Sequence, residues 1–144
     1  MIIKIDEEDF QQKLNKSMWG IAIELQESLK EKLTQEHGAD TGELKSSIIV
    51  KVENNSIIIE MSEQGKYIEF GTPPHMPPVE ALQGWVRRKW GAGSKDGDPK
   101  NMAAAWRLAY AIKRRGTRPY PFIRPTFNNE LIPIVQKNLT LNFK

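Results

Sequence analysis

This 144-residue chain is poor in histidine and cysteine, the side chains that most often act as nucleophiles, general bases or zinc ligands. There is no cysteine, and the two histidines, His37 and His75, are far apart with no acidic residue at the spacing of a helical zinc motif. Gly91, Gly93 and Gly97 do not stand between a strand and a helix, as the glycines of a phosphate-binding loop do. We therefore expect no metal, no cofactor and no enzymatic activity.

Glu69, in the run YIEFGT, is the one carboxylate set among apolar residues. Burial raises the pKa of a carboxylic acid, which would suit a general acid. A catalytic acid of this kind normally has a second titratable group beside it, and none is evident here. The sequence favours a hydrogen-bonded structural role for Glu69 over a catalytic one.

Charge is unevenly distributed along the chain, although the formal net charge is only +3. Residues 1–83 hold 15 acidic and 8 basic side chains, whereas residues 84–124 hold 2 acidic and 11 basic ones. One interpretation is a pair of oppositely charged faces that favour a polyanion partner or oriented self-association. The other is a solvated basic surface without a partner.

The basic segment 87–118 carries the only polyanion signal. Its cations would suit nonspecific phosphate contacts, but no helix-turn-helix, zinc-finger or RNP motif accompanies them. A nonspecific nucleic-acid-binding protein is therefore the alternative function that the sequence leaves open. The candidate DNA-facing or interface residues are Arg87, Arg88, Lys89, Arg114, Arg115 and Arg118.

Apolar periodicity predicts a long amphipathic helix over 9–37 and a final helix from Pro125 to about Leu139, kinked at Pro133 and followed by a tail at 140–144. Between them it predicts strands over 47–53 and 56–62 joined by a tight Asn54-Asn55 turn.

The segment 66–70 fits either a strand or a helical turn. Two middle helices are expected over 79–90 and 101–116, with Trp106 on the buried side of the second, around a flexible glycine-rich loop at 91–101. The chain is expected to be one α+β domain, 1–144, in which a small antiparallel sheet with a central hairpin is packed by the long N-terminal helix, the two middle helices and the C-terminal helix. No stretch is long and apolar enough to predict a membrane span or signal peptide, so we expect a cytoplasmic protein without membrane contact.

Two proline-rich stretches, YIEFGTPPHMPP (67–78) and RRGTRPYPFIRP (114–125), share a Gly-Thr pair followed by prolines. Prolines preset extended backbone, which suits mutual packing or recognition by a neighbour. We favour packing against each other, with Phe122 buried and a Glu69–Arg124 ion pair; two unrelated surface loops remain the alternative. If the pair forms, Arg124→Ala should cost about 3 kcal/mol through an orphaned charge.

Three motifs, in order, resemble one known family. DTGELKSSI (40–48), YIEFGT (67–72) with its prolines, and PFIRPTF (121–127) before a C-terminal helix are similar to the gene-product-ten-like head-tail joining, or tail-completion, proteins of lambdoid long-tailed bacteriophages and prophages. The resemblance covers about residues 5–140. The motif residues are Asp40, Thr41, Gly42, Glu69, Phe70, Gly71, Thr72, Pro121, Phe122, Arg124 and Pro125.

The resemblance implies a virion structural protein without catalysis. It would form a ring, of six copies in the assembled neck, between the head-completion or connector proteins and the tail terminator or tail tube. It would be made in the host cytoplasm and end in the virion neck, where nonspecific DNA contact in the lumen is a further expectation.

Overall fold

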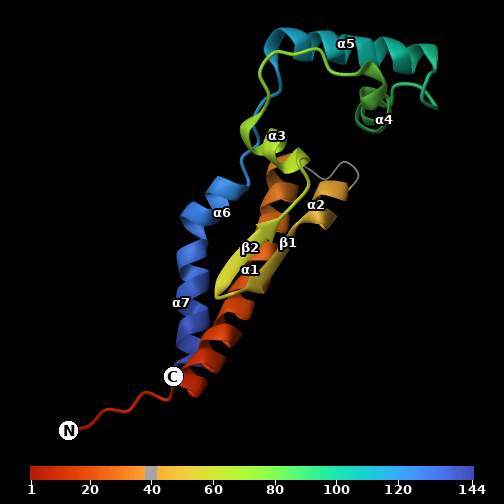
Figure 1. The fold of residues 1–144 in the computed structure, drawn as a ribbon. Coiled ribbons are helices and arrows are strands. Elements are labelled where there is room, and N and C mark those ends of the chain that lie inside the picture. Colours follow the sequence, from red (N-terminus) through yellow and green to blue (C-terminus); the bar gives the residue numbers. More distant parts are fainter. Residues whose placement is uncertain (38–41) are drawn as a thin grey trace.

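The computed structural model describes residues 1–37 and 42–144. They form a helical protein with one small antiparallel sheet, so the predicted α+β class is confirmed (Figure 1). In chain order the elements are α1 (Glu7–His37), α2 (Glu43–Ser47), β1 (Ile49–Glu53), β2 (Ser56–Glu60), α3 (Gln64–Phe70), α4 (Val79–Trp90), α5 (Pro99–Arg115), α6 (Ile123–Asn129) and α7 (Leu131–Asn142).

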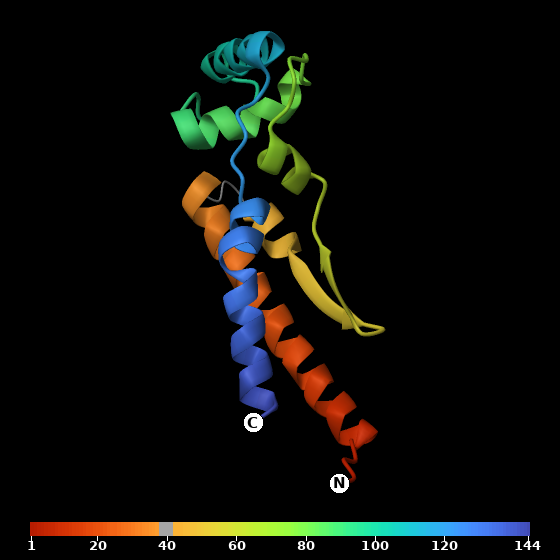
Figure 2. The ribbon, with the colours of Figure 1, turned by 90° about the vertical axis from the view of Figure 1, so that its left-hand side faces the viewer.

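The long helix α1 is the central element of the lower part of the molecule. Its buried stripe, Ile21, Ala22, Leu25, Leu29 and Leu33, follows the predicted periodicity. The side chain of Asp6 accepts a hydrogen bond from the Asp9 N–H at 3.1 Å, which caps the first turn. The hairpin packs on one side of α1 and α7 on another (Figures 1 and 2).

The hairpin closes through Asn54 and Asn55, both in the left-handed region with φ of 49° and 57°. The register pairs Val50 with Ile59 and Val52 with Ile57, and these four side chains face the core of α1. Both strands are shorter than predicted.

Ser47 belongs to α2 instead of the first strand, because its hydroxyl donates to the Leu44 carbonyl and accepts from the Ser62 N–H. The open assignment of 66–70 is resolved as the end of helix α3.

The C-terminal region is two helices instead of one. Glu130 separates α6 from α7, three residues before Pro133, whose ring clashes with the carbonyl four positions earlier. The predicted kink is therefore confirmed, but Pro125 is the third residue of α6 and not the first. Helix α7 continues to Asn142, into the segment expected as a tail.

The two middle helices do not cover the sheet, contrary to the expected arrangement. Helices α4 and α5 pack on each other around Val79, Val86, Ala104, Ala105 and Ala109, a core separate from that of α1, the hairpin and Phe122. These two helices form the upper lobe. Two chain segments join it to the lower lobe, which contains α1, the hairpin, α6 and α7 (Figures 1 and 2).

The buried side of α5 differs from the prediction. Trp106, expected among the buried residues, is 43% exposed, and Asn101 is fully buried instead. The buried positions of α5 recur every three to four residues, and Trp106, one residue after Ala105, lies about 100° around the helix from that stripe.

Candidate functional site

The two Gly-Thr pairs meet at the junction of the lobes. The Thr72 N–H donates to the Thr117 carbonyl at 3.2 Å, the Thr117 N–H donates to the Thr72 carbonyl at 3.0 Å, and the two hydroxyls are 2.8 Å apart. This reciprocal bridge is antiparallel. The expectation that the proline-rich stretches pack against each other is confirmed, and the alternative of two unrelated loops is wrong.

Glycine precedes each threonine for a steric reason. Gly71 and Gly116 have φ of 68° and 71° with extended ψ, a conformation that only glycine adopts readily. A Cβ on Gly71 would overlap the carbonyl oxygen of Thr117, and one on Gly116 would overlap that of Thr72. The two Gly-Thr pairs are thus equivalent halves of one crossing.

Glu69 joins the second motif to the third. Its carboxylate is 1% exposed and accepts from the N–H groups of Phe122 (2.7 Å), Ile123 (2.8 Å) and Arg124 (3.2 Å). These are the free amides at the start of α6, so a side chain 53 residues earlier caps this helix.

Arg124 completes the carboxylate's partners. Its Nε donates to Glu69 Oε1 at 2.8 Å and its Nη2 to the Glu69 carbonyl at 3.2 Å, so the predicted ion pair is confirmed. Phe122 is fully buried, also as predicted. The Arg124 side chain, however, is 56% exposed, because it turns outward over the ring of Phe70, 5.1 Å from the ring centroid.

The ionisation of Glu69 follows from these contacts. Burial raises the pKa of the carboxyl, but the hydrogen bonds from Arg124 and from the backbone amides of Ile123, Phe122 and Arg124 outweigh burial and hold the pKa below its ordinary value. A carboxylate held ionised by four donors has no proton to give. The arrangement suits a structural clamp and does not suit a general acid.

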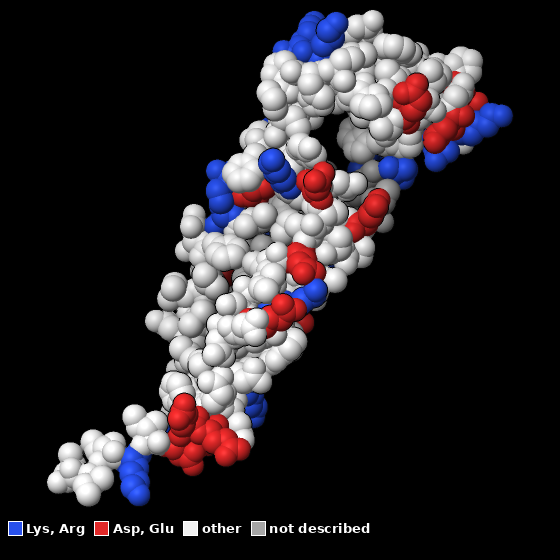
Figure 3. Space-filling model, in the orientation of Figure 1, with Lys and Arg blue, Asp and Glu red and all other residues white. Residues whose placement is uncertain are grey.

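The basic segment divides into two surfaces. On α4, Arg87 pairs with Asp96 at 3.3 Å, and Arg88 has an interaction of its own, while Lys89 is exposed. At the end of α5, Lys113, Arg114, Arg115 and the following Arg118 are exposed and form no ion pair within the part of the chain that the structure describes. These four residues are the basic end of the upper lobe, visible as blue atoms in Figure 3.

The opposite end of the molecule is acidic. Glu7, Glu8 and Asp9 occupy the first turn of α1, and acidic atoms gather there at the bottom of Figure 3. A basic cluster and an acidic cluster therefore lie at opposite ends of an elongated molecule, with acidic and basic atoms also spread over the surface between them (Figure 3).

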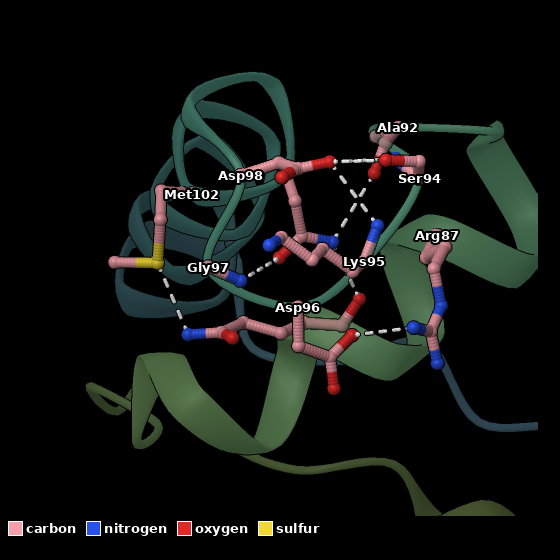
Figure 4. A network of polar contacts seen from close by, with 10 residues as sticks. Arg87, Ala92, Ser94, Lys95, Asp96, Gly97, Asp98 and Met102 are labelled. Atoms are coloured by element: carbon pink, nitrogen blue, oxygen red, sulfur yellow. Dashed lines mark hydrogen bonds and ion pairs between the residues drawn. The ribbon is translucent and has the colours of Figure 1, made fainter.

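The loop between α4 and α5 is internally hydrogen-bonded (Figure 4). Asp98 accepts from the Ser94 hydroxyl and from the N–H groups of Ser94 and Lys95, at 2.7–3.1 Å. The hydroxyl, then the two amides, lower the pKa of Asp98. Residues 99–101 belong to α5, so the loop is shorter than the predicted 91–101. A shallow hollow beside it presents no group of titratable side chains beyond Asp98 and Lys100.

Sequence reasoning missed two polar residues that hold elements together. Asn101 donates to the carbonyls of Gln83 (2.9 Å) and Ala92 (3.1 Å), which ties α4 and its loop to α5. The hydroxyl of Ser17 donates to the Asn138 carbonyl at 3.3 Å, where α1 meets α7. The available signal was a polar residue at a stripe position, such as Ser17 between Leu14 and Ile21.

The remaining predicted motif residues are divided between the start of α2 and the segment that Glu69 holds. Gly42 begins α2 with a φ of 77°, whereas Asp40 and Thr41 lie outside the described residues. Pro121 and Pro125 flank Phe122 and Arg124 in the segment that Glu69 holds. Over residues 1–37 and 42–144, no group of three or more histidine, cysteine or acidic side chains is placed to bind a metal. No helix in those ranges has the length and apolarity to cross a membrane.

Comparisons with protein-family models, with characterised proteins and with solved structures find no match for this chain.

Proposed function

We propose that this chain is a structural protein of a phage neck, which joins head to tail by forming a ring with its own copies and with neighbouring neck proteins. The observation that carries the proposal is the convergence of two family-like motifs on one clamp. YIEFGT supplies Glu69 and the Gly71-Thr72 half of the crossing, and PFIRP supplies the amides and guanidinium that Glu69 binds. A shared motif that builds the fold suits a structural protein.

The shape and surface also support assembly. Large apolar side chains remain exposed over the molecule, including Trp19, Ile23, Ile132 and Leu141 at 46–64%. Trp19 and Ile23 are one helical turn apart on α1, so together they offer a partner one exposed apolar surface. The acidic end of α1 and the basic end of the upper lobe add complementary charge for oriented contacts.

A genetic experiment tests the role directly. In an inducible prophage that carries this gene, its disruption should leave DNA-filled heads and complete tails that are not joined, as seen by electron microscopy. Plasmid-borne wild-type protein should restore joined particles. The control variant Gly91→Ala should restore them too, since Gly91 has open space around its Cα. Joined, infectious particles without the protein would refute the proposal.

The alternative, a nonspecific nucleic-acid-binding protein, rests on the basic end of the upper lobe. If these four cations contact phosphates, the affinity for DNA should fall by roughly 100-fold when the salt concentration rises from about 50 to 200 mM. Replacing Arg114 and Arg115 by serine should remove about half of that salt dependence, whereas Arg87→Ser should not, because Arg87 is paired with Asp96. Absence of binding to duplex DNA at low salt would eliminate this function.

A further inference from the structure

The first five residues, MIIKI, form an apolar arm outside the fold. Met1, Ile2, Ile3 and Ile5 are 75–110% exposed, and the arm extends beyond the start of α1 (Figure 1). The cap that Asp6 makes on α1 sets the direction in which the chain leaves the helix. Four large apolar side chains in water are unfavourable, so a contact that covers them would be stabilising.

The two edges of the hairpin differ by one hydrogen bond to α1. Because Glu53 pairs with Ser56 across a two-residue turn, Ile57 and Ile59 direct their N–H and C=O groups away from β1. The corresponding N–H of Val50 on the β1 edge is already bound by the side chain of Gln26 of α1, at 2.9 Å. No strand among the described residues pairs with the β2 edge.

We propose that the arm of one copy adds as a third strand to the β2 edge of a second copy. The inference rests on the proposed function in one respect, that copies assemble in a ring, and it names the surfaces that join them. A two-stranded sheet is marginal until it gains a third strand, and β2, with five residues, is long enough to pair with an extended arm.

Side-chain alternation matches the arm to this edge. If Ile3 and Ile5 lie on the inner face, they extend the apolar row of half-buried Ile57 and Ile59. Lys4 then lies on the outer face with Glu60, which already attracts Lys51 there at 2.8 Å. In the same parity Ile2 lies with Lys4 on the outer face, which is also the face of the exposed Ile58.

The occupant is a second copy because of where the arm is aimed. It leaves α1 away from its own hairpin, whose tip lies beside α1 through the Gln11–Asn55 hydrogen bond of 2.9 Å (Figure 1). An arm at one place and an acceptor edge at another make a head-to-tail contact, in which every copy gives one strand and receives one. Repetition of such a contact closes a ring when the rotation between copies allows it.

The absence of native cysteine makes cross-linking a clean test. A tagged Lys4→Cys copy is mixed with an untagged Glu60→Cys copy over a concentration series and treated with a short bis-maleimide. We expect several-fold more tagged-untagged product than with Lys100→Cys, an exposed control on α5 far from the hairpin. Equal yields with both partners, or no specific product at the highest concentration, would overturn the inference.

Two further variants separate the remaining outcomes. The doubly substituted chain Lys4→Cys/Glu60→Cys, if it only closes within one molecule, would show that the arm folds onto its own hairpin and would overturn the inference. Ile3→Glu/Ile5→Glu should abolish assembly measured by mass photometry, with unchanged far-UV circular dichroism. If that variant still joins heads to tails, the arm contact is not needed, so the inference fails and the proposed function stands. If instead the specific cross-link forms but disruption of the gene leaves heads and tails joined, the inference stands and the proposed function fails.

Discussion

Glu69→Ala should destabilise the protein more than any change to its partner Arg124. The substitution removes the acceptor of three backbone amides, of which the Phe122 N–H lies at a fully buried position. A buried donor left unsatisfied costs about 1–3 kcal/mol, and loss of a helix cap costs about 0.5–2 kcal/mol. Because the amides of Ile123 and Arg124 are only partly buried, we expect a total of about 3 kcal/mol.

Arg124→Ala should cost only about 1 kcal/mol, well below the value expected from sequence for an orphaned buried charge. The carboxylate keeps three backbone donors without the guanidinium, and the arginine side chain is 56% exposed, so water can replace part of its contact. The pair Glu69→Gln/Arg124→Ala should cost less than the sum of the single changes, because both act on one contact.

Urea unfolding followed by far-UV circular dichroism measures these differences, with the midpoint and slope fitted for each variant. Glu63→Ala is the matched control, since Glu63 is an exposed carboxylate just before α3, and it should change stability by less than about 0.5 kcal/mol. Equal losses for Glu69→Ala and Arg124→Ala would refute the reasoning, because the ion pair and not the helix cap would then be the main contribution.

Three other predictions follow from the junction and the upper lobe. The depressed pKa of Glu69 means that its contribution to stability is complete above the unfolded-state pKa of about 4.3 and is lost as the pH falls through the lower folded pKa, so Glu69→Gln should flatten the acid side of the stability profile. Gly116→Ala should lower the free energy of unfolding in urea by more than about 2 kcal/mol, against about 1 kcal/mol for Gly91→Ala. Both substitutions add a Cβ at positive φ, but only the Cβ at Gly116 meets the Thr72 backbone. Equal costs would contradict a tight crossing. Asn101→Ala should cost about 2 kcal/mol, seen first by tryptophan fluorescence because Trp85, Trp90 and Trp106 all lie on α4 and α5; a normal fluorescence transition would show that the two buried carbonyls do not need this donor.

Local pattern was sufficient for much of the secondary structure. The apolar period of α1, the bounds of α4 and the Asn54-Asn55 turn could be predicted because each depends on residues within one or two turns of the chain. The Glu69–Arg124 pair was also predictable, since a carboxylate in an apolar run needs a cation or several donors wherever it is buried.

Tertiary structure alone decided what each surface packs against. An apolar stripe shows that α4 and α5 bury one side, but it does not show that they bury it on each other instead of on the sheet. The same holds for Trp106, which lies beside the stripe that α5 buries against α4 and is therefore exposed. Periodicity specifies a face, whereas the partner of that face comes from contacts between residues far apart in the chain.

The junction shows the same division most clearly. The two Gly-Thr pairs are visible in the sequence as similar stretches, but their antiparallel bridge exists only because the chain leaves the lower lobe at Gly71 and returns at Gly116. Likewise, α6 has no capping side chain of its own, and its start is set by Glu69 from 53 residues earlier. The residue types set the local chemistry: a carboxylate that accepts several hydrogen bonds and two glycines that allow a close crossing. The path of the backbone decided which segments this carboxylate and these glycines bring together.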